Sequence, residues 1–286
     1  MPILDREEYI EQAYFFRVLR ERLAEGMATQ TVLEGLDQEI LSTTRLPLAI
    51  QFLATELKHS GLLSSGFARL GHYFTPFQAF VVANSEDETR RFSTELALLV
   101  LEREALYRAG SIPRAGLFIY QFEAICRNRL GYDRGIQALQ ADPFYDDDWR
   151  RFLDLIHSQL GLIDFADIIF VRSELYVQDQ RRRDPEYHPS LPPLFGEKEG
   201  KIARANRGRD PLYLFAALQR QLGYPEVPRP RPRDDPAAKL EALQARVHQL
   251  EGRLKVVEGE VRGQVDLSQF LANPDKVPRR DLDDLE

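Results

Sequence analysis

The sequence predicts an all-α protein with a multi-helix globular body, a proline-rich spacer, a C-terminal coiled-coil helix and a flexible acidic tail. Apolar residues recur every three or four positions along most of the first 225 residues, which is the spacing of one helix face. Prolines at alternate positions then precede a heptad repeat. We therefore expect four segments: 1–225 (body), 226–236 (spacer), 237–263 (coiled-coil helix) and 264–286 (tail).

The composition of the chain supports a folded body. With 286 residues, of which 43% are hydrophobic and 29% charged, the chain has the usual balance of a globular protein and enough apolar residues for a sizeable core. Its net charge of −7 is unevenly distributed, because residues 172–233 hold 13 basic and 8 acidic side chains whereas the flanking regions are acidic. An anionic partner would therefore be attracted only to this middle region.

The single cysteine, Cys126, excludes an internal disulfide and a thiolate metal site within one chain. We expect it to be a small buried apolar residue. The first residues lack the basic and apolar segments of a signal peptide, and no apolar run reaches the ~18 residues that a membrane span requires. These features predict a cytoplasmic protein without membrane contact.

The first half of the body is predicted to hold four helices. Residues 6–26 have apolar positions at helical spacing and end at a glycine. Two further helices are expected between 29 and 61, separated near Pro47, because proline favours a first helical turn and disrupts an interior one. Residues 84–110 are predicted as one helix, with a polar start, acidic residues in the first turn and basic residues near the end.

Three further segments follow. Residues 115–131 keep a helical spacing of apolar side chains, and residues 141–161 are predicted as a turn and a helix that begins at the acidic triplet Asp146–Asp148. We interpret these carboxylates as acceptors for the free amide groups at the helix start rather than as a metal site. Residues 162–178 are apolar enough for a helix or for a buried strand around Ile168–Val171.

The body is predicted to end in a loop and one more helix. Residues 181–200 combine prolines, glycines and alternating charge, which indicates an irregular loop. A helix over 211–223 is expected to start after Asp210 as N-cap, with Pro211 at the first helical position and Gly223 as its end. The alternating prolines that follow favour an extended, semi-rigid spacer.

The most regular pattern in the chain is the heptad repeat within 237–263. Its apolar residues alternate three and four positions apart, as in the contact line of a coiled coil. We call these seven the seam residues: Leu240, Leu243, Val247, Leu250, Leu254, Val257 and Val261. A helix of this length is marginally stable alone in water, so the seam requires a partner.

The charges beside the seam favour a parallel homodimer. In a parallel pair, position g of one helix faces position e of the next heptad in the other, which places Arg246 opposite Glu251 and Arg253 opposite Glu258. Both pairs have opposite charge. The alternatives are association with a different protein and packing of this helix on the body, which the spacer disfavours because it holds the helix away.

Two short motifs suggest a metal-dependent helical enzyme as an alternative. Glu56 with His59, and Asp154 with His157, are each three residues apart, so each pair shares a helix face. With carboxylates from the neighbouring helices, their order resembles that of ferritin-like di-iron proteins, although one motif has Asp in place of Glu. A chain with 45 acidic residues produces such pairs by chance, and ordinary helix-surface pairing is the simpler interpretation. We expect no metal and no cofactor.

Two other segments could bind a partner. The basic segment 198–209 could contact nucleic acid, although acidic residues interleave with its lysines and arginines and a solvated or internally paired face is the simpler interpretation. The tail could dock in a protein groove as a short helix, with Leu267, Phe270 and Leu271 as anchors. In the absence of a nucleophile motif or a phosphate-binding glycine loop, the sequence predicts a non-enzymatic interaction or scaffold protein.

Overall fold

The computed structural model describes residues 3–89 and 92–230, together with Gln244, Val247 and Leu250. The chain divides into two units, Met1–Pro230 and Arg231–Glu286. The described part of the first unit is all-α, as predicted, and its only extended pairings are two isolated β-bridges. Most of the predicted spacer and coiled-coil helix, and the whole tail with Leu267, Phe270 and Leu271, lie outside the described residues.

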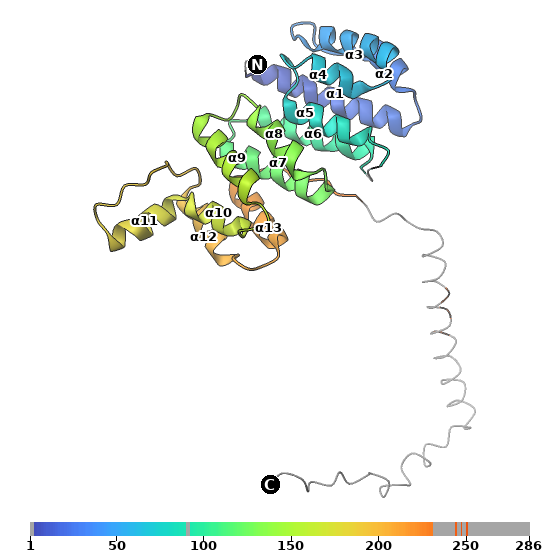
Figure 1. Ribbon diagram of the computed structural model, residues 1–286. Coiled ribbons are helices and arrows are strands. Elements are labelled where there is room, and N and C mark those ends of the chain that lie inside the picture. Colours follow the sequence, from blue (N-terminus) through green and yellow to red (C-terminus); the bar gives the residue numbers. More distant parts are fainter. Residues whose placement is uncertain (1–2, 90–91, 231–243, 245–246, 248–249, 251–286) are drawn as a thin grey trace, which may run out of the picture. The chain divides into compact units, whose positions relative to one another are not determined.

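Thirteen helices build the described part of Met1–Pro230 (Figure 1). They are α1 (Arg6–Ala24), α2 (Thr29–Leu36), α3 (Leu46–Ser60), α4 (Leu63–Arg69), α5 (Pro76–Ser85), α6 (Thr94–Arg108), α7 (Arg114–Asn128), α8 (Tyr132–Gln140), α9 (Asp147–Gln159), α10 (Phe165–Val171), α11 (Glu174–Arg183), α12 (Glu197–Ala205) and α13 (Pro211–Leu222). None of the helices in the part of the chain that the structure describes is long and apolar enough to cross a membrane.

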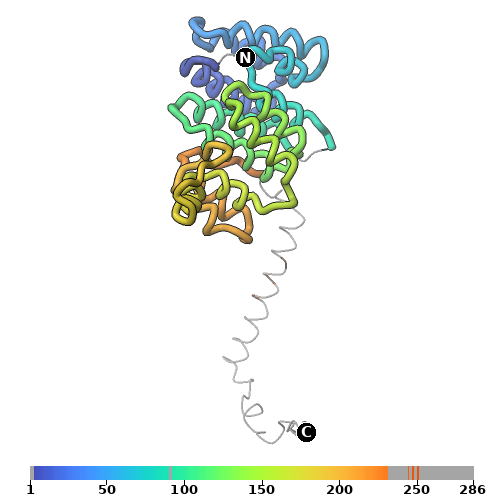
Figure 2. The backbone as a smooth tube through the Cα atoms, turned by 60° about the vertical axis from the view of Figure 1, so that its left-hand side comes forward, coloured from blue at the N-terminus to red at the C-terminus, as the bar shows by residue number. Residues whose placement is uncertain are grey.

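The helices are stacked roughly in chain order within this unit. Figure 2 shows α1–α5 at one end, α6–α9 in the middle and α10–α13 at the other end. Helix α1 packs along α6, α8 packs on α9, and α10 packs on α12. Because α6 contacts both α1 and α7, it joins the first group of helices to the second.

Local signals set several helix boundaries as predicted. Pro47 lies in the first turn of α3, and Gly61 ends this helix in the left-handed conformation (φ 71°) that glycine adopts most readily. At α13 the side chain of Asp210 accepts a hydrogen bond from the Leu212 amide, and Gly223 ends the helix with φ 68°. The predicted helices over 6–26, 115–131 and 141–161 are also confirmed as α1, α7 and α9.

The single helix predicted over 84–110 is wrong at its start. Asn84 and Ser85 belong to the last turn of α5, and Asn84 is buried and donates to the Phe80 carbonyl oxygen. Helix α6 begins instead after Ser93, whose hydroxyl accepts from the Leu96 amide at 3.2 Å. The segment before Ser93 has the polar and acidic composition of a helix start, but it forms the connection between two helices.

The open alternative for residues 162–178 is resolved as helix. Residues around Ile168–Val171 form α10, and α11 begins after Ser173, which caps it through the Tyr176 amide. The predicted loop 181–200 is shorter than expected, because α11 extends to Arg183 and α12 begins at Glu197.

Aromatic side chains form the centre of the core. Phe118 of α7 lies within 5.5 to 6.4 Å, between ring centroids, of aromatic rings from α9, α10 and the segment before α12. These rings are fully or almost fully buried, as are Phe15, Phe16, Phe67 and Phe77 in the other half of the body. Burial of such large apolar surfaces is the main contribution that stabilises the stack.

The body extends a few residues past its predicted end. The Tyr224 hydroxyl donates to the Glu123 carboxylate of α7 at 2.7 Å, and the Asn128 side-chain amide donates to the Pro228 carbonyl oxygen at 3.1 Å. Val227, which lies between Tyr224 and Pro228 in the sequence, is buried. The first residues of the predicted spacer therefore pack on α7 instead of leaving the body.

Candidate functional site

The first predicted metal motif lies on α3. The Glu56 carboxylate is buried and accepts hydrogen bonds from the Ser65 hydroxyl at 2.8 Å and from Arg69 at 2.5 Å. His59 is exposed in the last turn of the helix. These contacts join α3 to α4, so Glu56 already has protein partners for both carboxylate oxygens.

The second predicted metal motif lies on α9, which is separated from α3 in Figure 1. Asp154 is exposed and accepts from the Gln140 amide at 2.6 Å, and His157 lies 3.3 Å from the Asp133 carboxylate of α8. The structure therefore does not bring the two motifs together. Across 3–89 and 92–230, no three His, Cys, Asp or Glu side chains are grouped in a way that could hold a metal ion.

The basic segment 198–209 is largely paired with acidic residues. Lys201 lies 2.5 Å from Glu197 within α12, and Arg204 lies 3.1 Å from Asp179 of α11. Arg207 forms an ion pair with Asp167 and stacks over the Phe170 ring. In these ion pairs, neighbouring carboxylates offset much of the positive charge of the segment.

Two seam residues lie within the described part of the chain. Val247 and Leu250 are helical, and they keep 52% and 57% of their surface exposed. The remaining seam residues, Leu240, Leu243, Leu254, Val257 and Val261, lie outside the described residues.

Cys126 is partly buried and packs against the core. Burial raises the pKa of its thiol to about 12, so the nucleophilic thiolate is scarce at neutral pH. This agrees with the expected structural role of the residue.

A group of buried polar side chains surrounds Arg108, in the last turn of α6. Its guanidinium donates to the Glu104 carboxylate at 3.0 Å and forms an ion pair with Asp142. Gln121 of α7 donates to the same Glu104 oxygen at 2.7 Å, and the Tyr145 hydroxyl donates to Gln121 at 2.7 Å. We call these five residues the Arg108 cluster, and all five are buried.

Burial controls the protonation of the Arg108 cluster. It raises the pKa of Glu104, whose second carboxylate oxygen has no hydrogen-bond partner among the described residues. Burial opposes the charge of Arg108, but the neighbouring Asp142 and Glu104 carboxylates outweigh it and raise the arginine pKa. The guanidinium therefore stays charged. It also forms cation–π contacts with the rings of Tyr9 and Phe144. Because the charged and polar groups of this cluster are bonded to one another, we assign it a structural role.

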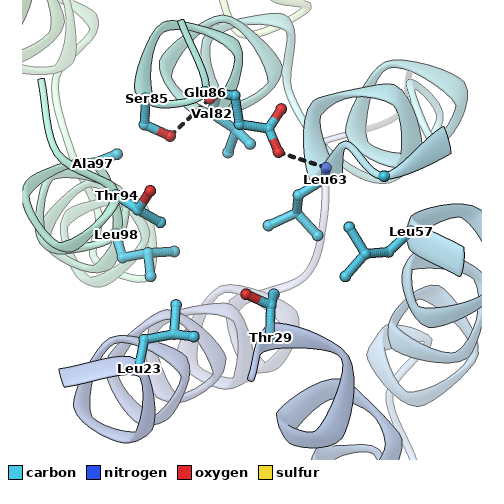
Figure 3. Close-up of a pocket in the computed structure, with 11 residues that line it drawn as sticks. Leu23, Thr29, Leu57, Leu63, Val82, Ser85, Glu86, Thr94, Ala97 and Leu98 are labelled. Carbon is cyan, nitrogen blue, oxygen red and sulfur yellow. Dashed lines mark hydrogen bonds between the residues drawn. The ribbon is translucent and has the colours of Figure 1, made fainter. Parts of the chain in front are cut away.

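A pocket of about 130 Å³ lies at the other end of α6 (Figure 3). Six consecutive helices contribute one end each: the C-terminal ends of α1, α3 and α5 and the N-terminal ends of α2, α4 and α6. The lining is mainly aliphatic and points toward a common space in Figure 3. The aliphatic lining residues are Leu23, Leu57, Leu63, Val82, Ala97 and Leu98. We call this cavity the α1–α6 pocket.

The polar side chains of the α1–α6 pocket are few. The Glu86 carboxylate accepts from the Leu63 amide at 2.5 Å and from the Ser64 amide at 3.0 Å, so it caps the start of α4 (Figure 3). The Ser85 hydroxyl donates to the Val82 carbonyl oxygen at 2.8 Å. What remains is a mainly aliphatic cavity with the hydroxyls of Thr29, Ser85 and Thr94 and the Glu86 carboxylate spaced around it, which suits binding of a small apolar group.

Sequence reasoning missed both the Arg108 cluster and the α1–α6 pocket. Glu104 and Arg108 are four residues apart, as in countless exposed helix pairs, and Asp142 is too distant in sequence to signal their burial. The pocket has no local motif, because each helix contributes only one to three residues to it. The one available signal was the series of chain reversals at Gly26, Gly61 and the acidic segment after Ser85.

Comparisons of the chain with protein-family models, with curated proteins and with solved structures find no significant match.

Proposed function

We propose that this protein is a non-enzymatic interaction or scaffold protein whose helical body is held in two copies by a parallel coiled coil of residues 237–263. The observation that supports this most directly is the exposure of two seam residues. Val247 occupies position a of the repeat and Leu250 position d, and both are helical with about half of their surface open. An apolar seam in water is stabilised by a second helix.

The body itself supports a binding role over a catalytic one. Among the described residues, the Arg108 cluster is paired internally, buried Glu56 and Glu123 are paired with neighbouring side chains, and the Glu86 carboxylate of the α1–α6 pocket is bonded to backbone amides. We therefore extend the proposal to a scaffold whose bodies contact partners while the coiled coil determines their number.

The mass of the protein in solution tests self-association. The intact chain should have twice its chain mass of 33.0 kDa by light scattering after size exclusion, and a version that ends at Pro232 should be monomeric. Leu250→Glu, which places a charge on the seam, should be monomeric as well. The matched control Ala245→Glu places the same charge at the outward position f and should remain dimeric. A monomeric intact chain would remove the proposal.

The orientation of the two helices is tested by cross-linking. Leu243→Cys introduces a thiol at position d near the start of the repeat, where a parallel pair brings the two copies of this residue within disulfide distance. Oxidation should then give a covalent dimer, whereas the unaltered chain, with only the partly buried Cys126, should give none. A dimer by mass that does not cross-link would show an antiparallel or displaced pairing.

A further inference from the structure

The size of the α1–α6 pocket limits what it can hold. Its volume of about 130 Å³ is well below the ~300–1,000 Å³ of sites that enclose cofactors and drug-sized molecules. It is close to the ~150 Å³ of a dry protein cavity that holds benzene. A single leucine or isoleucine side chain is a group of this size, and anchors of this kind fill pockets at protein interfaces.

Exposed apolar side chains flank the residues that line the pocket. Met27 is 41% exposed and precedes Thr29 by two positions, and Leu62 is 48% exposed and lies between Gly61 and Leu63. A partner whose anchor entered the pocket could cover both residues in addition to the cavity itself. Methionine suits such a rim, because its flexible side chain adapts to irregular apolar surfaces.

Two exposed acidic residues adjoin lining residues of the pocket in the sequence. Glu25 follows the lining residue Leu23 by two positions, and Glu95 follows the lining residue Thr94 directly. Both are exposed, and neither forms an ion pair with any residue that the structure describes. By contrast, the nearby Lys58 is already paired with Glu34 at 2.6 Å. These two carboxylates favour a partner with positive charge beside its apolar anchor.

We infer that the α1–α6 pocket is a docking site for a protein segment that inserts one aliphatic side chain and contacts Glu25 and Glu95 with basic residues next to it in sequence. The occupant is a peptide segment, because the cavity is too small for a cofactor and because the residues that flank its lining are both apolar (Met27 and Leu62) and acidic (Glu25 and Glu95). The inference does not rest on self-association, because all the residues concerned lie in the first unit of the chain.

Peptide binding to the full chain tests the inference. The probe is a short fluorescein-labelled peptide with leucine at its centre and two basic residues on each side, and fluorescence anisotropy at low ionic strength reports binding. The same peptide with alanine in place of leucine should bind roughly tenfold or more weakly, because it loses the buried side chain. Equal binding of the two peptides to the unaltered chain would overturn the inference, and this comparison needs no variant that might misfold.

Two variants locate the binding to the pocket. Thr94→Leu should fill part of the cavity and lower the leucine-over-alanine ratio, whereas the matched control Thr55→Leu, on the exposed side of α3, should leave the ratio unchanged. Glu25→Gln combined with Glu95→Gln should weaken both peptides about equally. A Thr94→Leu variant that keeps the ratio would place the binding elsewhere and overturn the inference.

The remaining outcomes separate this inference from other occupants and from the proposed function. A peptide with glutamate in place of the basic residues that bound more tightly would contradict the charge argument. A lower mass of Thr94→Leu in solution would show that a second copy of the chain covers the pocket, which also overturns the inference. The monomeric Leu250→Glu chain should retain the full leucine-over-alanine ratio, so failure of the coiled coil and failure of the pocket are distinguishable.

Discussion

The two ends of helix α6 differ in how their side chains are packed: charged residues are buried at one end, and apolar residues border a cavity at the other. At its C-terminal end, Glu104 and Arg108 are buried and bonded to partners from α7 and from the connection between α8 and α9. At its N-terminal end, Ala97 and Leu98 line a cavity that no side chain fills. Charged residues are rarely buried and apolar residues usually pack closely, so each end departs from the usual pattern.

The comparison suggests different roles for the two features: the Arg108 cluster stabilises the fold, and the α1–α6 pocket is suited to binding. In the Arg108 cluster, several charge-assisted hydrogen bonds hold α6, α7 and the connection between α8 and α9 in one arrangement. In the α1–α6 pocket, free volume lowers the packing density and costs stability that a better-filled interior would retain. Such a loss of stability is commonly found where the cavity serves a function.

The largest expected effect on stability is at the C-terminal end of α6, in the Arg108 cluster. Arg108→Met removes the positive charge and leaves Glu104 and Asp142 buried beside each other. Breaking a buried ion pair in this way typically costs about 3–5 kcal/mol. The free energy of unfolding from urea titration should fall by this amount.

A matched change at an exposed pair serves as the control. Lys58→Met breaks the ion pair with Glu34 on the surface, where solvent screening leaves such pairs little effect on stability. If Arg108→Met cost no more than Lys58→Met, the Arg108 cluster would not hold the elements together and the contrast between the two ends of α6 would disappear.

The next effect is on the pH dependence of stability. Burial raises the pKa of Glu104 above its value of about 4.3 in the unfolded chain. The folded state then binds more protons, so the stabilisation is complete below the unfolded pKa and is lost as pH rises through the folded pKa. The slope is at most about 1.4 kcal/mol per pH unit.

Glu104→Gln removes this titration and should flatten the profile of unfolding free energy above pH 4.3. Urea titrations of the variant and the unaltered chain at matched pH values, up to about pH 8, check this. The neighbouring tyrosines Tyr9 and Tyr145 do not interfere, because burial raises their pKa further above 10. Parallel profiles for the two chains would show that Glu104 keeps one protonation state throughout this range.

Local chemistry made part of the fold predictable. Pro47, Gly61, Asp210 and Gly223 act through their own backbone or side chain, so the ends of α3 and α13 could be placed from the sequence. The start of α6 could not, because Asn84 and Ser93 are both good helix-start residues and only packing decides between them. The buried position of Asn84 comes from α5 lying against its neighbours.

Neither end of α6 could be predicted as a site, because both depend on distant residues. The spacing of Glu104 and Arg108 is typical of an exposed pair until Asp142 and Gln121 pack against it. The pocket needs six helix ends at once, and a one-residue shift of any helix would change its lining. The seam, by contrast, can be proposed from the sequence alone, because a heptad repeat lies in one continuous segment, and its pairing stays a prediction.

The smallest effect is at the open end of α6, and its sign is opposite. Thr94→Leu places two more carbon atoms beside Ala97 and Leu98, so it should fill part of the α1–α6 pocket and raise the free energy of unfolding by about 0.5–1 kcal/mol, as cavity-filling changes commonly do. Thr55→Leu, on the exposed side of α3, should change it by less than about 0.5 kcal/mol. Urea titration of both variants measures the difference. A loss of stability in Thr94→Leu would mean that the cavity cannot accept an apolar group without strain, and a peptide side chain would meet the same obstacle.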